Sequence, residues 1–152
     1  MTVMGFFNKS GKTEKPTTGD NLEKTLSAIL VKDIMSKKLI TASPSTTAHQ
    51  ISKMMEQGIG SVLVKNGSDN MGIITDRDFA IKIVANKHSY DIPIEKIASF
   101  PLQTIGSNES VLDAAKQMAS KKIRKLAVIE NDKVVGIVTS SDLIRQLSKM
   151  TQ

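Results

Sequence analysis

The strongest constraint on this chain is an internal repeat. Residues 72–79 read Gly-Ile-Ile-Thr-Asp-Arg-Asp-Phe, and residues 136–143, 64 positions later, read Gly-Ile-Val-Thr-Ser-Ser-Asp-Leu. Both runs place a glycine, two β-branched residues, a threonine, two polar residues, an aspartate and an apolar residue in one order. A repeat on this scale indicates a structural unit that buries its apolar face against its neighbour.

The similarity extends well beyond these two runs. Residues 59–64 align with residues 123–128 at the same spacing, and the match continues upstream toward the start of each copy. We therefore divide the chain into a first repeat over residues 31–93 and a second over residues 94–150. Each copy alone would have a marginal core, so the two are expected to fold together.

Each repeat shows the same order of predicted elements. Alternating β-branched runs predict a short opening strand and a hairpin, and apolar residues at helical spacing predict one helix before the hairpin and one after it. The fold class is therefore predicted as α/β (α+β), with two βαββα units whose short mixed sheets pack on helices. The opening strands are expected at 39–41 and 102–105, the hairpins at 62–64 with 71–75 and at 126–129 with 134–138, and the helical faces at Ala48, Ile51, Met55; Phe79, Ala80, Ile83, Val84; Val111, Ala114, Ala115, Met118; and Leu143, Ile144, Leu147, Met150.

The N-terminal part lies outside the repeat. Residues 1–20 are rich in lysine, threonine and glycine without periodicity, which predicts a disordered tail. Residues 21–30 carry leucine and isoleucine at helical spacing and are predicted as a lead-in helix that packs on the repeats or on a second copy.

Composition narrows the function classes. The chain has no cysteine, two histidines and no run of about 20 apolar residues, so we expect a cytoplasmic protein without a membrane span, metal site or catalytic nucleophile–base set. It is therefore predicted not to be an enzyme. The formal net charge of +6 is spread along the chain, which makes nucleic-acid binding a lesser expectation. The densest basic cluster, residues 121–125, is interpreted as a solvated helix end.

The threonine and aspartate of the repeated motif allow two interpretations. In the first, Thr75 with Asp78 and Thr139 with Asp142 only cap the helices that follow. In the second, the helix N-termini bind a phosphate and the carboxylates accept hydrogen bonds from a ribose diol. Arg77 and Arg124 would then contact phosphate oxygens, and the motif glycines would let the ligand approach the strand.

The repeated Gly-x-x-Thr-x-x-Asp motif, with Asp33-Ile34-Met35 at the start of the first copy, resembles the cystathionine-β-synthase (CBS) domain pair, or Bateman module. The resemblance covers about residues 31–150. It implies two clefts related by a pseudo-twofold axis, which in this family commonly bind adenosine ligands. It assigns Thr75 and Asp78 to one cleft and Thr139 and Asp142 to the other, with Thr41 and Thr104 near the base.

The two copies differ where phosphate contacts would form. Ser140-Ser141 stand where the first copy has Asp76-Arg77, and Arg124-Lys125 replace Gly60-Ser61, so the clefts are not expected to be equivalent.

The preferred function is a sensor that binds AMP, ADP, ATP or an S-adenosylmethionine-like molecule and modulates an effector protein, with a homodimer as the expected assembly. Two alternatives remain: a ligand-free dimerisation or interaction module in which the motif residues only cap helices, and a basic nucleic-acid-binding protein.

Overall fold

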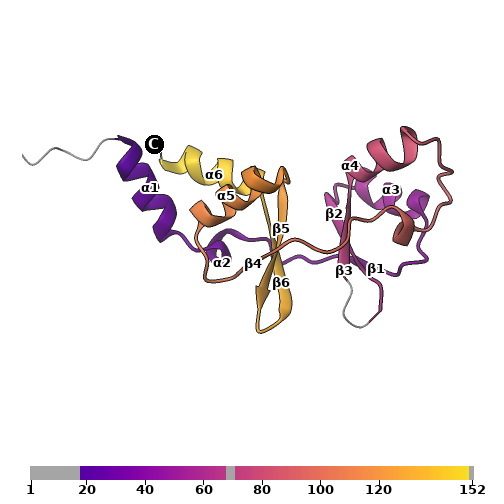
Figure 1. The fold of residues 1–152 in the computed structure, drawn as a ribbon, viewed down its shortest axis with the longest axis horizontal. Helices are drawn as coiled ribbons and strands as arrows, with labels where there is room; N and C mark the ends of the chain where they lie inside the picture. Colours follow the sequence, from indigo (N-terminus) through magenta and orange to yellow (C-terminus); the bar gives the residue numbers. More distant parts are fainter. Residues whose placement is uncertain (1–17, 68–70, 151–152) are drawn as a thin grey trace, which may run out of the picture.

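The computed structural model describes residues 18–67 and 71–150, which form two lobes, each with one three-stranded sheet. The helices of both lobes lie on the outer sides, and the strands lie toward the centre of the molecule (Figure 1). Every helix within the described residues is too short or too polar to span a lipid bilayer. The elements are α1 (Thr18–Ala28), α2 (Val31–Ile34), β1 (Thr41–Ala42), α3 (Ala48–Glu56), β2 (Ser61–Lys65), β3 (Met71–Thr75), α4 (Asp76–Asp78), η2 (Phe79–Val84), η3 (Ile94–Lys96), β4 (Thr104–Gly106), α5 (Val111–Lys121), β5 (Lys125–Glu130), β6 (Lys133–Thr139) and α6 (Ser140–Met150).

The two sheets share one topology. In the first lobe β1 runs parallel to β2, which forms an antiparallel hairpin with β3; β4, β5 and β6 repeat this order in the second lobe. Thr41 lies opposite Leu63, and Thr104 lies opposite Ala127 in the matching register. The predicted βαββα units and hairpins are confirmed. The opening strands begin two residues later than the sequence predicted.

The helices before the hairpins begin at capping boxes. The Thr47 hydroxyl accepts from the backbone N–H of Gln50, whose side chain accepts from the Thr47 N–H. Ser110 and Asp113 form the same reciprocal pair at the start of α5. These contacts satisfy N–H groups that a helix start leaves without partners.

The lead-in helix differs in its bounds from the prediction. Helix α1 begins at Thr18, so residues 18–20 of the predicted tail are helical, with Asp20 favourably placed in the first turn. It ends at Ala28 because Leu30 adopts an extended conformation before α2. Residues 1–17 of the predicted tail lie outside the described residues.

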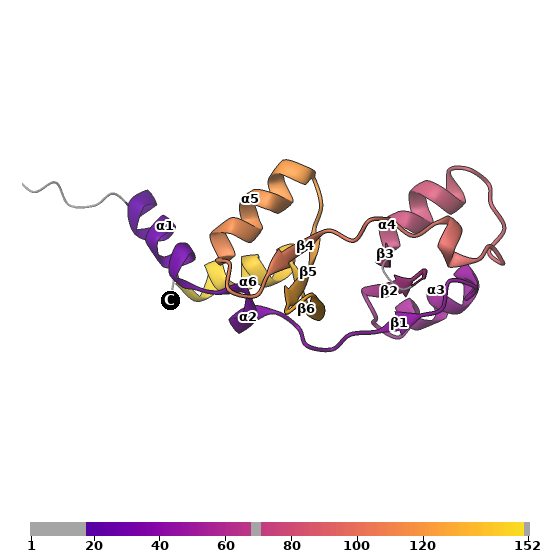
Figure 2. The ribbon, with the colours of Figure 1, turned by 60° about the horizontal axis from the view of Figure 1, so that its bottom comes forward.

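Two segments pass between the lobes, and both views show them (Figures 1 and 2). The first crossing segment, residues 31–40, starts against the second lobe, where Ser36 exchanges two backbone hydrogen bonds of 2.9 Å with Ile137 on β6. The second crossing segment, residues 94–103, starts against the first lobe, where Ser99 makes the equivalent pair with Ile73 on β3 at 2.8 and 3.1 Å. Each lobe thus holds the opening residues of the other repeat.

The motif glycines make these crossings sterically feasible. A Cβ on Gly72 would lie 2.7 Å from both the Phe100 ring and the Ser99 carbonyl oxygen. A Cβ on Gly136 would overlap the Met35 side chain and lie 2.9 Å from the Ser36 carbonyl oxygen. The interpretation that these glycines admit a ligand is therefore wrong, because the crossing segments occupy the space.

The core has three parts that follow this exchange. One cluster fills each lobe: Val31 is buried among residues of the second lobe, and Ile94 and Ile97 are buried among residues of the first. A third cluster joins the inner faces of the two sheets through Leu63, Ala127 and Ile137. The lobes therefore share buried apolar surface and are not independent units.

The closing helices bury less of their apolar surface than predicted. In the first lobe the helix widens after α4 into the π-helical η2, where Ala85 N–H donates to the Ala80 carbonyl five residues back. Ile83 is buried, but Val84 is 74% exposed; in α6, Leu143 is buried while Ile144 is 65% exposed. Phe79 is partly buried against the first lobe's core as well. The predicted apolar faces are therefore correct at Phe79 and Ile83 in the first lobe and at Leu143 in the second, and wrong at the exposed Val84 and Ile144.

Replacing Gly72 with alanine should destabilise the fold. The new methyl group would collide with Phe100 and with backbone, so we expect the free energy of unfolding to fall by about 1–3 kcal/mol. Gly60→Ala is a matched control, because its Cβ would meet only the Lys125 Nζ at an ordinary 3.4 Å. Urea denaturation of both variants measures the difference. Equal stabilities would show that the crossing segment is not tightly packed on β3.

Candidate functional site

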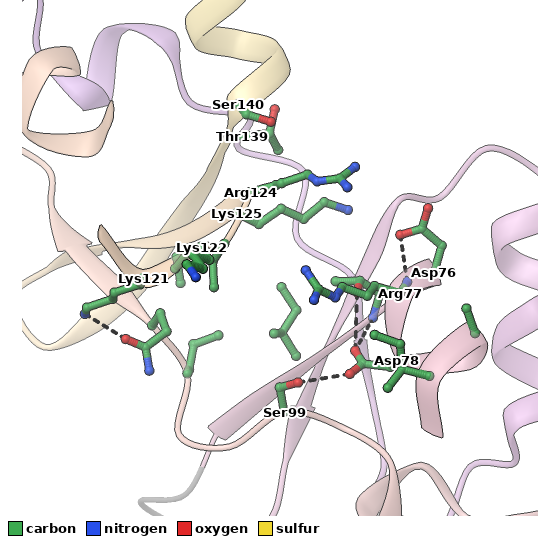
Figure 3. A pocket seen from close by; sticks show the side chains of 18 of the residues that line it. Asp76, Arg77, Asp78, Ser99, Lys121, Lys122, Arg124, Lys125, Thr139 and Ser140 are labelled. Atoms are coloured by element: carbon green, nitrogen blue, oxygen red, sulfur yellow. Dashed lines mark hydrogen bonds between the residues drawn. The ribbon is translucent and has the colours of Figure 1, made fainter. Parts of the chain in front are cut away.

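A cleft of about 960 Å³ lies between the two lobes (Figure 3). One wall comes from the end of β3 and the closing helix of the first lobe, together with the second crossing segment. The other wall comes from the end of α5 and the start of β5, with the end of β6 at the rim. The lining residues are Ile73, Thr75–Asp78, Ala80–Lys82, Ser99, Pro101–Gln103, Lys121–Lys125, Ala127 and Thr139–Ser141.

Asp78 is the most constrained polar residue of the first wall. Its Oδ2 accepts from the backbone N–H of Thr75 at 2.8 Å and from the Thr75 hydroxyl at 3.3 Å. Its Oδ1 accepts from the Ser99 hydroxyl at 3.0 Å and lies 3.1 Å from the Lys82 Nζ. Asp78 is only 6% exposed, and these contacts use the roughly four acceptor positions of a carboxylate.

Lys82 and Ser99 join the first lobe to the second crossing segment. The Lys82 Nζ donates to the Ile97 carbonyl at 2.8 Å and to the Ser99 hydroxyl at 3.3 Å. Asp78 thus belongs to a network that secures the segment leading into β4.

Two backbone donors at the start of α4 already have partners within the chain. Thr75 N–H donates to Asp78, and Arg77 N–H donates to the Asp76 Oδ1 at 3.0 Å. The sequence interpretation relied on free N–H groups here to bind a phosphate. These two N–H groups are therefore occupied within the chain.

The second wall supplies four of these side chains within five residues. Lys121 ends α5, Lys122 follows in a left-handed conformation with φ 54°, and Arg124 and Lys125 lead into β5. Lys125 donates to the Gly60 carbonyl of the other lobe at 2.6 Å. Arg124 and Lys125 extend across the cleft toward the side of Arg77 (Figure 3).

The cleft is strongly basic over an apolar floor. Its lining includes six basic side chains and two acidic ones, beside Ile73, Leu102 and Ile123. Partial burial lowers the pKa of Lys125, and Arg124 lowers it further, while Asp76 and Asp78 oppose the shift. A cation that is costly to keep charged in the ligand-free state would gain from a bound anion.

Six of the nine predicted site residues lie on this one cleft: Thr75, Arg77, Asp78, Arg124, Thr139 and Ser140. The other three, Asp142, Thr41 and Thr104, are not among the residues that line the cleft. Asp142 accepts from Thr139 and pairs with Arg145 at 3.0 Å, Thr41 lies on β1, and the Thr104 carbonyl accepts from Gln117 at 2.9 Å.

Sequence reasoning did not assign Lys82, Ser99, Lys121, Lys122 or Lys125 to the site. Lys82 could have been found, because it stands four residues after Asp78 on a helix. Ser99 is 21 residues from Asp78 and could not have been. The basic cluster at 121–125 is largely exposed, as interpreted, but it faces the cleft.

Lys125 should make stability depend on pH. Its pKa is lowered from the ordinary 10.5 in the folded chain and returns to that value on unfolding. Between the two pKa values the unfolded chain binds more protons, so stability rises with pH through this window. The Lys125→Arg variant should lack this rise in stability, because arginine keeps its positive charge throughout the pH window. Urea denaturation at about pH 8, 9 and 10 should show the wild type gaining stability relative to the variant. A constant difference would contradict the assigned shift.

Comparison with known proteins agrees with this architecture. The family model of the CBS domain matches twice, at residues 31–85 and 94–149. MK0525 of Methanopyrus kandleri is 38% identical to this chain over 122 residues. The aligned part is 78% of this chain and 62% of the length of MK0525. YhcV of Bacillus subtilis, a CBS domain-containing protein, is 32% identical over 78% of this chain and 86% of its own.

A similar fold has been solved with ligands. The CBS domain pair of protein MJ0100, crystallised in complex with 5′-methylthioadenosine and S-adenosyl-L-methionine, superposes with a TM-score of 0.69 at 31% identity, covering 80% of this chain and 97% of that one. Both repeats of the present chain match the family model, and the crossing lobes have the same overall fold as that pair. The chain belongs to the CBS domain family and carries two copies of the domain in tandem.

Proposed function

We propose that this chain is a regulatory module, not an enzyme, that binds an adenosine-type ligand in the cleft between its lobes. The candidates are AMP, ADP, ATP and S-adenosylmethionine-like molecules. The observation that carries the proposal is the convergence of basic side chains from both repeats, with Thr75 and Asp78, on one cleft with an apolar floor. The adenosyl ligands held by the MJ0100 domain pair support the same ligand class.

The cleft offers a contact for each part of such a ligand. The apolar side chains Ile73, Leu102 and Ile123 would pack on an adenine ring. Arg77 and Arg124 would donate charge-assisted hydrogen bonds to phosphate oxygens. Asp78 would accept from the ribose diol, and because its acceptor positions are already used, the ribose would displace Ser99 or Lys82.

That displacement would link binding to conformation. Ser99 and Lys82 secure the second crossing segment, which continues into β4 of the other lobe. A ligand that contacts both walls and loosens this network would favour one arrangement of the lobes over another. In a homodimer, the same change would alter the surface presented to an effector protein.

The contacts of the Asp78 carboxylate within the protein also agree with an alternative in which the chain is a purely structural module. In that alternative Asp78 and Asp142 are equivalent helix caps, and neither contacts a ligand. The two aspartates are well matched for a test, since both accept from the preceding threonine but only Asp78 lines the cleft.

The proposal predicts that an adenosine ligand stabilises the protein and that Asp78 contributes to its binding. At 100 times Kd, a ligand should raise the free energy of unfolding by about 2.7 kcal/mol. Asp78→Asn should weaken binding roughly 10- to 150-fold, whereas Asp142→Asn should leave binding in this cleft unchanged. Ser99→Ala, which removes one of the two contacts of the Asp78 Oδ1 and leaves the Lys82 ion pair, should not weaken binding. Thermal shift followed by calorimetry measures all four proteins.

The capping alternative predicts the opposite pattern. Each asparagine variant would then lose about 0.5–2 kcal/mol of stability, and neither would change an affinity. Absence of any thermal shift with AMP, ADP, ATP and S-adenosylmethionine at high concentration would contradict the sensing function itself.

A further inference from the structure

Resting on the proposed function, we propose that this cleft selects ligands with two or more linked phosphates over nucleoside monophosphates and over S-adenosylmethionine. The number and the placement of the charged side chains that line the cleft support this selectivity.

Most of the positive charge in the cleft is free of acidic partners. Of the two acidic side chains, Asp78 is paired with Lys82 at 3.1 Å. Asp76 is then the one remaining carboxylate beside five cations, Arg77, Lys121, Lys122, Arg124 and Lys125, among the lining residues. Each phosphate added to a ligand therefore gains attraction, while the sulfonium of S-adenosylmethionine is repelled.

The cations are also distributed over both walls of the cleft. Lys121 and Lys122 lie at the end of α5, Arg124 and Lys125 point across the cleft from β5, and Arg77 stands on the opposite wall (Figure 3). A single phosphate group presents three acceptor oxygens around one phosphorus atom, whereas linked phosphates extend the acceptors along a chain. A chain of phosphates would contact successive cations and join the two lobes.

The fold does not require the four basic residues Lys121, Lys122, Arg124 and Lys125, because the first repeat has no basic residue at the corresponding positions. Gln57, Gly58, Gly60 and Ser61 occupy the positions that correspond to Lys121, Lys122, Arg124 and Lys125. The helix ends themselves are equivalent: Ile59 N–H donates to the Met54 carbonyl, and Ile123 N–H donates to the Met118 carbonyl. The same backbone thus folds without a positive charge at any of these four positions.

Lys122 is the most informative member of this set. It has φ 54° where Gly58 has φ 99°, and non-glycine residues in this region are uncommon. Glycine would satisfy the helix end at lower conformational cost. The lysine at this position places a positive charge on the cleft where the first repeat has none.

The test is calorimetry with ATP, ADP, AMP and S-adenosylmethionine as separate probes, without divalent cations. ATP should bind at least about tenfold more tightly than AMP, and S-adenosylmethionine should bind most weakly. Lys122→Gly should retain the melting temperature. Its affinity for ATP should fall about tenfold, and its affinity for AMP should fall by less than about threefold. Arg124→Gln should do the same. Lys116→Gln, which removes one exposed charge from α5 outside the cleft, should leave both affinities unchanged.

Equal affinity for ATP and AMP would overturn this inference while the proposed function stands, and so would an ATP-to-AMP ratio that Lys122→Gly and Arg124→Gln leave unchanged. Tighter binding of S-adenosylmethionine than of ATP would also overturn it. Failure of every probe to bind would instead reject the proposed function, and the inference with it.

Discussion

Two short backbone pairings, Ser36 with Ile137 and Ser99 with Ile73, hold the remaining structure in place. Each adds an extended segment to the edge of the other repeat's sheet, so that the hydrophobic core of one lobe includes residues from the repeat that forms the other lobe. Glycine at positions 72 and 136 is required because a crossing chain passes directly over each. Since the lobes exchange their opening residues, neither can complete its core alone.

This exchange also determines what the site can do. Ser99, which pairs with β3, simultaneously donates to Asp78, so the residue that secures the crossing segment is also a cleft residue. The pseudo-symmetric position, Ser36, pairs with β6 in the same way, but the corresponding aspartate, Asp142, is paired with Arg145 of its own helix. One backbone frame therefore carries two different polar networks. The difference arises from a few side chains and not from the fold.

Much of the fold could be predicted because it depends on local patterns. The hairpins follow from β-branched runs, and helices α3 and α5 follow from apolar spacing and from the capping residues Thr47 and Ser110. The crossing segments could not be predicted, because nothing in residues 94–103 indicates that they pack on β3, a strand that ends at Thr75. The π-helical winding of η2 was also missed, since it arises from packing and not from periodicity.

The site was predicted in part for the same reason. The repeated motif identified Thr75 and Asp78, and comparison of the copies identified Arg124. The saturation of Asp78 by Ser99 and Lys82 depends on contacts that join distant segments. The position of Lys121 and Lys122 on the cleft depends on how the two lobes face each other. Local sequence indicates that these lysines are exposed, but only the assembled lobes show what they face.

The electrostatics of the cleft suggest how binding and conformation would be coupled. Cations from both lobes face one another across a partly enclosed space, and the lowered pKa of Lys125 reflects the cost of keeping one of them charged there. This repulsion opposes the apolar contacts of Leu63, Ala127 and Ile137, which pack the inner faces of the two sheets together. An anion placed between the walls would convert the repulsion into attraction from both sides. Because the crossing segments tie the two lobes to each other, a ligand that contacts both walls would influence the arrangement of both repeats.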